Sequence, residues 1–244
     1  MSTHTTRTRE QWLNARQRLL ALEKEHTRQA DELARQRREL PWLPVEKKYT
    51  LQTAEGPKTL ADLFDGRSQL VIYHFMFGPD YDAGCPVCSS IADSFNPVLP
   101  HLRARDVTMI CVSQAPLEKL LAYRERMGWS FEWASSHESD FNYDFEHSRS
   151  RDQSSAWVAG APVAVTRFAS DCGTDPAGYM AQGPGLSVFS RADGDVYLTY
   201  ATTARGLEPV MTYYGILDRV PRGRAEGEHA DATWLRRHDE FAAA

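Results

Sequence analysis

The sequence has no long hydrophobic run and no excess of basic charge. Residues 1–40 are polar and charge-rich, without the apolar stretch of a signal peptide or a membrane span. The 28 Lys and Arg residues against 33 Asp and Glu residues give a net charge of -5, which offers no broad positive field to a phosphate backbone. The ordinary hydrophobic share of 42% predicts a folded, soluble protein. We expect a cytoplasmic location, with neither nucleic acid nor a membrane as a partner.

Cysteine is scarce as well, with four among 244 residues: Cys85, Cys88, Cys111 and Cys172. Four are too few to hold a secreted domain of this size together through disulfides. Two of them form Cys85-Pro-Val-Cys88, and a close C-x-x-C pair in a reducing compartment indicates redox or metal chemistry. We expect Cys111, within an apolar run, to be an inert core residue, and Cys172 to be an exposed loop thiol without a partner.

Glycine and proline are absent from residues 8–40, where the less polar positions recur at spacings of three and four. This pattern predicts one long amphipathic helix that Pro41 and Pro44 end. Its narrow apolar stripe fits packing on its own domain or a homodimer in which two such helices pair as a short coiled coil. We assign residues 1–44 to an N-terminal helical extension, 45–220 to the main domain and 221–244 to a C-terminal tail.

Strands and helices alternate in the main domain. The expected strands lie at residues 70–77, 107–113 and 131–135, with hairpins at 49–60 and 186–200. The expected helices lie at residues 86–103, 117–127 and 207–217. Residues 147–182 contain scattered Gly and Pro without clear periodicity, so we interpret them as an irregular insertion or lid.

The dithiol follows a predicted strand and loop, and it opens a predicted helix. A cysteine at a helix N-terminus meets free N–H groups and the positive end of the helix dipole, and both favour its thiolate. Pro86 suits the first helical position, where its missing N–H would have had no partner. One helical turn returns Cys88 beneath Cys85, so Cys85 is the predicted nucleophile and Cys88 the residue that resolves a mixed disulfide. Asp80 and Asp82 in the loop would oppose the thiolate if they came close.

Pro184 is a further candidate for the site. It lies two residues before an expected strand, where a cis-proline facing the dithiol would shape a backbone edge for a disulfide substrate. An ordinary turn at Gly183-Pro-Gly185 explains the same residues.

His74 lies in the strand that leads to the dithiol. It is either a satisfied core histidine or, beside Cys85 and Cys88, the third ligand of a copper ion, because thiolate and imidazole suit that metal. His137 and His147 are further imidazoles whose positions the sequence does not define. A zinc site would need two more ligands at matching spacing. Dithiol chemistry itself requires no cofactor. Copper is therefore expected only if the protein is a copper-binding protein or a copper-dependent oxidase.

Several blocks resemble those of a bacterial thioredoxin-like family that carries a domain-of-unknown-function label and is catalogued as predicted dithiol–disulfide oxidoreductases. They are Leu40-Pro-Trp42, Tyr73-His-Phe-Met-Phe-Gly-Pro-Asp80, Gly84-Cys-Pro-Val-Cys88, Ala115-Pro-Leu-Glu-Lys119, Met127-Gly-Trp-Ser-Phe131, Ser139-Asp-Phe-Asn-Tyr-Asp-Phe145, Pro184-Gly-Leu-Ser-Val-Phe189 and Arg236-Arg-His-Asp-Glu240. The resemblance covers most of the chain from about Leu40, implies a thioredoxin-like fold and makes Cys85 and Cys88 the dithiol. Residues 147–182 fit the family pattern poorly, which leaves room for a role specialised for a biosynthetic pathway.

The sequence therefore predicts an α/β protein, a thioredoxin-like and peroxiredoxin-related three-layer sandwich with an N-terminal helical extension. Its first predicted function is a thiol–disulfide oxidoreductase acting on a disulfide or thiol, either a small molecule or a protein, with Cys85, Cys88 and Pro184 at the site. The second is a copper-binding protein or copper-dependent oxidase that uses Cys85, Cys88 and His74. The third is a non-catalytic binding module of the same fold.

Overall fold

The computed structural model describes residues 5–161, 163–226 and 232–241, so parts of the expected extension and tail lie outside the described residues. The chain divides into two units, Met1–Pro41 and Trp42–Ala244. The first unit contains helix α1 (Arg9–Arg38), which is the long helix that the sequence predicts. Thr8 and Gln11 form a capping box at its start, and basic residues in its last turn complement the helix dipole.

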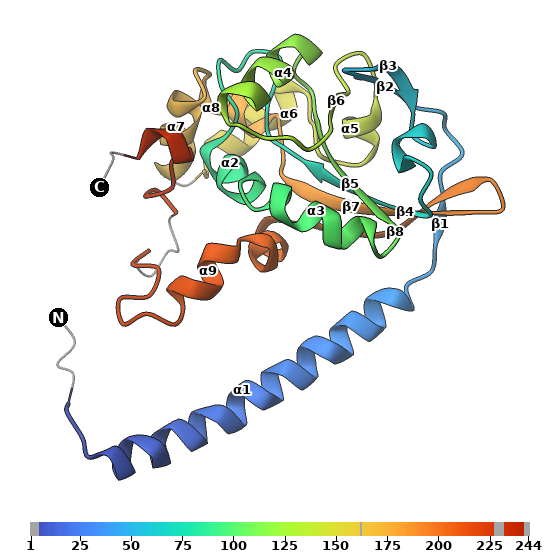
Figure 1. The fold of residues 1–244 in the computed structure, drawn as a ribbon. Coiled ribbons are helices and arrows are strands. Elements are labelled where there is room, and N and C mark those ends of the chain that lie inside the picture. Colours follow the sequence, from blue (N-terminus) through green and yellow to red (C-terminus); the bar gives the residue numbers. More distant parts are fainter. Residues whose placement is uncertain (1–4, 162, 227–231, 242–244) are drawn as a thin grey trace. The chain divides into compact units, whose positions relative to one another are not determined.

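The second unit is built on a mixed sheet (Figure 1). Its strands are β1 (Leu43–Pro44), β2 (Thr50–Thr53), β3 (Gly56–Thr59), β4 (Gln69–His74), β5 (Val107–Ser113), β6 (Trp133–Ser135), β7 (Gly185–Ala192) and β8 (Asp195–Thr203). Their order across the sheet is β1-β8-β7-β4-β5-β6-β2-β3. The central strand β4 runs parallel to β5 and antiparallel to β7. Asp193 and Gly194, which connect β7 to β8, both have positive φ, as a tight hairpin turn requires.

Helices and loops pack on both faces of this sheet and form two apolar clusters. One face is covered by α2 (Pro86–Ala92), α3 (Phe95–Arg103), α4 (Leu117–Arg126) and α9 (Thr212–Leu217). The other is covered by α5 (Phe141–Asp144) and the 3-10 helix η1 (Asp62–Phe64). The side chains of successive residues in β4 point to opposite faces of the sheet. Ile72 therefore packs in the cluster that includes α5, and Tyr73 packs in the cluster that includes α2.

This topology confirms the predicted fold class. A strand leads to the dithiol helix, a crossover returns the chain to a parallel neighbour, and an antiparallel hairpin lies on the other side of the first strand. That is the thioredoxin-like arrangement, with apolar layers on both sides of the sheet.

Two expectations about helices are corrected. The helix expected at residues 86–103 breaks into α2 and α3 around Asp93 and Ser94, because Pro97 lacks the N–H that would continue the α-helical ladder to the carbonyl of Asp93. Likewise, the helix expected at residues 207–217 is divided into the 3-10 helix η2 (Ala204–Val210), which contains Pro209, and α9.

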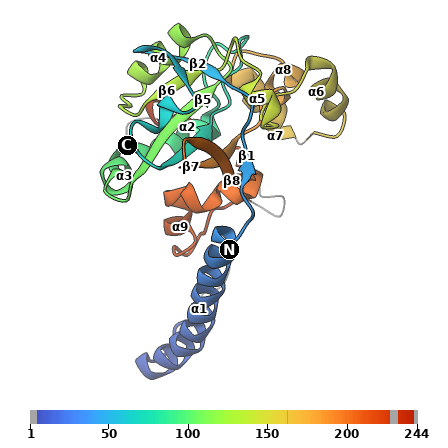
Figure 2. The ribbon, with the colours of Figure 1, turned by 90° about the vertical axis from the view of Figure 1, so that its right-hand side faces the viewer.

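The expectation that residues 147–182 are irregular is wrong. They contain α6 (Arg151–Val158), α7 (Val163–Asp171) and α8 (Pro176–Met180), and α8 contacts both other helices (Figure 2). Local caps start two of them: Ser150 and Gln153 form a capping box for α6, and the Asp175 side chain accepts from Gly178 N, 2.8 Å away, at α8. These helices are too short for a clear 3.6-residue periodicity, which is why the sequence pattern hides them.

Among the residues that the structure describes, no helix combines the length and the apolar character needed to cross a membrane.

Candidate functional site

The dithiol lies where α2 begins, and both of its thiols are buried. Cys85 is the N-cap of α2 and its N–H donates to the carbonyl of Met76, 3.0 Å away, which closes the loop after β4 onto the helix start. The N–H and hydroxyl of Ser89 both donate to the Cys85 carbonyl. The exposed fractions are 0% for Cys85 and 1% for Cys88, so solvent does not reach either sulfur directly.

The environment of Cys85 favours its thiolate. Burial raises the pKa of this thiol, but hydrogen bonds from the Cys88 thiol, the Tyr179 hydroxyl and the N–H groups at the start of α2 outweigh it. The Tyr179 hydroxyl lies 3.2 Å from Cys85 Sγ. The result lowers the pKa of Cys85 to about 7, so its thiolate is far more accessible at neutral pH than that of an ordinary thiol.

Cys88 has the opposite tendency. Burial raises its pKa well above the ordinary value, and the neighbouring Cys85 sulfur raises it further. The N–H of Met76 donates to Cys88 Sγ at 3.5 Å, a long contact that is normal for sulfur. A reactive first thiol and a protonated second thiol are what the roles predicted for Cys85 and Cys88 require.

Cys172 is not the exposed loop thiol that the sequence suggests. It is fully buried and belongs to the same apolar cluster as Cys85 and Cys88. Its carbonyl accepts from Asp82 N at 2.8 Å and from Ala83 N at 3.4 Å, so the end of α7 is joined to the loop before the dithiol. The polar neighbours of Cys172 misled the prediction, because the surrounding burial arises from a distant part of the chain. Burial raises the pKa of Cys172, which keeps it a neutral thiol.

The loop acid Asp80 is also tied to the insertion. Its Oδ2 accepts from the Thr174 hydroxyl at 2.8 Å and lies 3.8 Å from Arg151 Nη1. These contacts place the helices α6 to α8 against the loop that precedes the dithiol.

Arg237 is a site residue that the sequence did not single out. Its guanidinium, on a residue that is 3% exposed, donates to the carbonyl of Gly84 at 2.7 and 3.0 Å and to that of Asp171 at 2.8 Å. It also donates to the Tyr123 hydroxyl at 3.0 Å and to Glu240 at 2.6 Å. Gly84 immediately precedes Cys85, so the C-terminal segment holds the backbone of the dithiol loop. The available sequence signal was the position of Arg237 within the block at residues 236–240.

Pro184 is trans, because no cis peptide bond occurs in the described chain. The expected cis-proline is therefore wrong. Gly183 donates to the carbonyl of His147 at 2.8 Å, and Gly185 already pairs with His74 in the sheet. The chain thus enters β7 without a turn that would need the less stable cis isomer.

The structure does not bring His74 to the dithiol. Strand alternation places Tyr73 on the dithiol face of β4 and His74 on the opposite face, where its ring stacks on His147 with centroids 3.6 Å apart. His74 Nε2 lies 2.9 Å from Ser187 Oγ. His137 Nδ1 lies 3.1 Å from the carbonyl of Gln114.

Within the described ranges, no three His, Cys, Asp or Glu side chains are grouped so that they could hold a metal ion. The copper alternative therefore stays a prediction from the sequence, without a ligand set in the structure.

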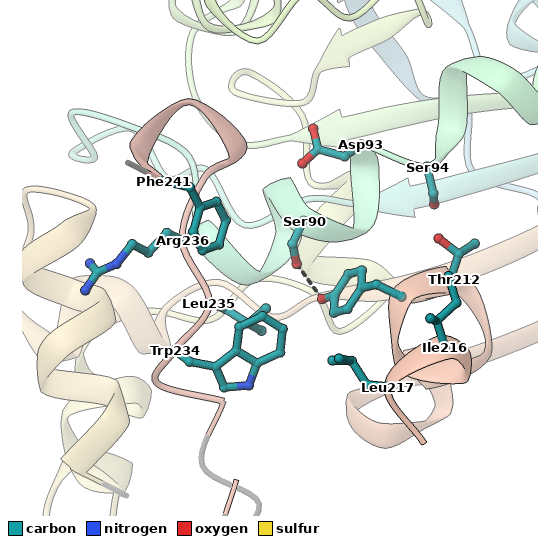
Figure 3. Close-up of a pocket in the computed structure, with 11 residues that line it drawn as sticks. Ser90, Asp93, Ser94, Thr212, Ile216, Leu217, Trp234, Leu235, Arg236 and Phe241 are labelled. Carbon is teal, nitrogen blue, oxygen red and sulfur yellow. Dashed lines mark hydrogen bonds between the residues drawn. The ribbon is translucent and has the colours of Figure 1, made fainter. Parts of the chain in front are cut away.

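An apolar hollow of about 400 Å³ lies beside α2 (Figure 3). Figure 3 shows Ile216 and Leu217 of α9 on one side of it and Trp234 and Phe241 of the C-terminal segment on the other. The dashed line in Figure 3 is the 2.7 Å hydrogen bond between Ser90 Oγ and the Tyr213 hydroxyl. Neither Cys85 nor Cys88 lines this hollow, which neighbours the dithiol helix.

A second hollow, of about 380 Å³, is also not lined by Cys85 or Cys88, but two residues that contact the thiols line it. Met76 and Tyr179, the residues that contact Cys88 and Cys85, line it together with Pro184. Pro184 thus shares this hollow with the residues that contact the thiols, although its peptide bond is trans.

Solved structures that resemble this chain include peroxiredoxins. A cysteine mutant of PrxQ from Xylella fastidiosa is 14% identical, with a TM-score of 0.45 over 69% of this chain and 88% of that one. Peroxidoxin BcpB from Mycobacterium tuberculosis is 12% identical, with a TM-score of 0.46 over 71% and 96%. A cysteine mutant of peroxiredoxin Q from Xanthomonas campestris is 16% identical, with a TM-score of 0.44 over 69% and 90%.

A search of curated proteins finds no match to the sequence. The family model described as "Bacterial protein of unknown function (DUF899)" matches residues 1–241. Because that match extends from the N-terminal helix through the dithiol to the segment that contains Arg237, the chain belongs to the DUF899 family of bacterial proteins.

Proposed function

We propose that this protein is a thiol–disulfide oxidoreductase in which Cys85 is the nucleophile and Cys88 the resolving thiol. The observation that carries the proposal is the opposite displacement of two adjacent pKa values at the start of α2. The pKa of Cys85 falls to about 7, whereas that of Cys88 rises well above its ordinary value. Such a pair holds one thiolate at neutral pH and keeps the second thiol protonated until it is needed.

The reaction proceeds in two exchanges. The Cys85 thiolate attacks one sulfur of a substrate disulfide, forms a mixed disulfide and expels the other sulfur as a thiolate that takes up a proton. Cys88 then loses its proton and attacks Cys85 Sγ, which releases the second substrate thiol and forms a Cys85–Cys88 disulfide. The substrate gains two electrons and two protons that the dithiol loses, and an external dithiol reductant restores the starting state.

The first exchange prepares the second. Once Cys85 is bonded to the substrate sulfur, it carries no negative charge, and the repulsion that helped to raise the pKa of Cys88 disappears. Deprotonation of Cys88 therefore becomes easier at the step in which its thiolate is required.

Burial of the dithiol favours a small substrate over a folded protein. Tyr179 contacts Cys85 directly and neither sulfur is exposed, so a disulfide on a protein surface would have to displace α8 to reach Cys85. A small-molecule substrate also fits the hypothesis of a role specialised for a biosynthetic pathway.

The test measures the reactivity of both thiols in the full chain. We expect the rate of Cys85 alkylation by iodoacetamide, followed by peptide mass spectrometry, to rise with a midpoint near pH 7, while Cys88 and Cys111 stay slow. Reaction of the reduced protein with bis(2-hydroxyethyl) disulfide should yield a Cys85–Cys88 disulfide. An ordinary thiol midpoint at Cys85, together with no intramolecular disulfide, would refute the proposal.

A further inference from the structure

The hollow next to the dithiol has the position and size of a substrate site. Its volume of about 380 Å³ lies in the range of small-molecule pockets. Met76 and Tyr179 form its wall on the dithiol side, and each contacts one of the two thiols. Tyr179 therefore belongs both to the wall of the hollow and to the immediate surroundings of Cys85.

A single guanidinium lines the hollow. Arg149 lines it and lies over the Trp157 ring, with Cζ 4.8 Å from the ring centroid. In residues 5–161, 163–226 and 232–241, no acidic side chain forms an ion pair with Arg149. The other two arginines of the insertion are paired, Arg151 with Asp175 and Asp80, and Arg167 with Asp171. Arg149 is thus a positioned cation that retains its capacity to bind a carboxylate.

A carboxylate lines the same hollow. Glu146 lines the hollow and also a neighbouring depression of about 560 Å³ that Arg149 and Trp157 share. Its φ of 61° places it in the left-handed conformation directly after α5, where glycine is favoured and another residue costs about 1 kcal/mol. The chain holds an acidic side chain at a position that local backbone energetics would assign to glycine.

We propose that this hollow binds a small disulfide or thiol that carries an amino-acid head group. Its carboxylate pairs with Arg149, its ammonium group with Glu146, and its sulfur is directed past Tyr179 to Cys85. The opposite charges in the lining match a zwitterion, and Met76, Trp157, Met180 and Pro184 give the carbon chain an apolar surface. The inference rests on the proposed dithiol exchange for the reaction, but the binding step stands by itself.

The test uses the Cys85→Ser/Cys88→Ser variant of the full chain, in which no exchange at the dithiol can occur. Isothermal titration with L-cystine should show binding, whereas cystamine, the same disulfide and amines without carboxylates, should bind about tenfold more weakly. Adding Arg149→Gln should remove the preference for cystine. Arg167→Gln, in α7 and outside the lining, is the matched control and should leave it unchanged.

Equal binding of cystine and cystamine, no binding of either, or a preference that survives Arg149→Gln would overturn the inference. Replacing cystine by 3,3′-dithiodipropionate, which lacks the amines, should weaken binding in the protein with Glu146 and not in its Glu146→Gln variant. A failure of the proposed function is distinct: the wild-type chain would then bind cystine as expected and leave its disulfide, and that of neutral bis(2-hydroxyethyl) disulfide, unreduced.

Discussion

The two faces of the central sheet each bury a pair of titratable side chains, and the two pairs behave differently. Cys85 and Cys88 lie on the α2 face, and His74 and His147 lie on the α5 face. Burial lowers the pKa of His147 to about 4 and that of His74 well below its ordinary value, so both imidazoles are neutral at pH 7. Burial alone would make Cys85 equally inert.

The difference lies in how far hydrogen bonds to the charged form offset the effect of burial on the pKa. Cys85 receives hydrogen bonds from the start of α2 and from Tyr179, and these stabilise its charged form more than burial destabilises it. In the histidine pair, burial lowers both pKa values more than hydrogen bonds with Asn142 at His74 and with Gly183 at His147 raise them. A buried group is therefore ionised only where hydrogen bonds to its charged form outweigh the effect of burial. Four measurements test this contrast.

The largest expected effect follows from removal of the nucleophile. Cys85→Ser should reduce disulfide exchange to background, because a serine hydroxyl is not ionised at neutral pH. Cys88→Ser should instead accumulate a mixed disulfide on Cys85, since no second thiol resolves it. Intact-mass spectrometry after incubation with bis(2-hydroxyethyl) disulfide distinguishes the two variants. Equal exchange rates for both variants would contradict the division of roles.

Arg237→Gln should cost about 3 kcal/mol in the free energy of unfolding, because the carbonyls of Gly84 and Asp171 lose their buried charged donor. The neighbouring exposed Arg236 supplies the control, and Arg236→Gln should change stability by less than about 0.5 kcal/mol. Chemical denaturation measures both. A loss in Arg237→Gln no greater than in the control would show that the C-terminal segment does not hold the dithiol loop.

The histidine face should make the protein sensitive to acid. The folded-state pKa of His147 lies near 4, below the unfolded value of about 6.5. Its neutral form therefore contributes fully to the free energy of unfolding above pH 6.5, and this contribution declines as the pH falls toward 4. Between pH 7 and pH 5 we expect a loss of about 2 kcal/mol from His147 alone. His147→Gln should flatten this slope, whereas exchange of the exposed His101 in α3 for Gln should not. Chemical denaturation of the wild-type chain and both variants at pH 7 and pH 5 measures the change in the free energy of unfolding. An equal change in wild type and His147→Gln would contradict the prediction.

Tyr179→Phe removes one donor from Cys85 and keeps the ring. The pKa of Cys85 should then rise by about one unit, and its alkylation rate at pH 7 should fall about fivefold. Tyr197→Phe in β8, where the half-buried ring contacts Trp42 far from Cys85 in the sequence, serves as the control. An unchanged midpoint in Tyr179→Phe would mean that the helix start alone sets the reactivity of Cys85.

Local patterns were sufficient for most elements of the fold. The apolar runs predicted β4 and β5, the Asp193-Gly194 turn predicted the β7–β8 hairpin, and the spacing in residues 8–40 predicted α1. The insertion was misread because its helices are short and their stability depends on packing against one another and on the loop before Cys85.

The sequence by itself determined the dithiol, since Cys85, Pro86 and Cys88 lie within one helical turn and their order alone places a thiol at a helix start. Only the tertiary structure decided which groups surround it. Tyr179 is 94 positions from Cys85, and Arg237 is 153 positions from Gly84, so no local periodicity relates them. Strand alternation likewise separated His74 from the dithiol although they are near in sequence. The motif that supplies the two thiols is therefore readable from neighbouring residues. The electrostatics that make Cys85 reactive arise from packing between segments that are distant in the sequence.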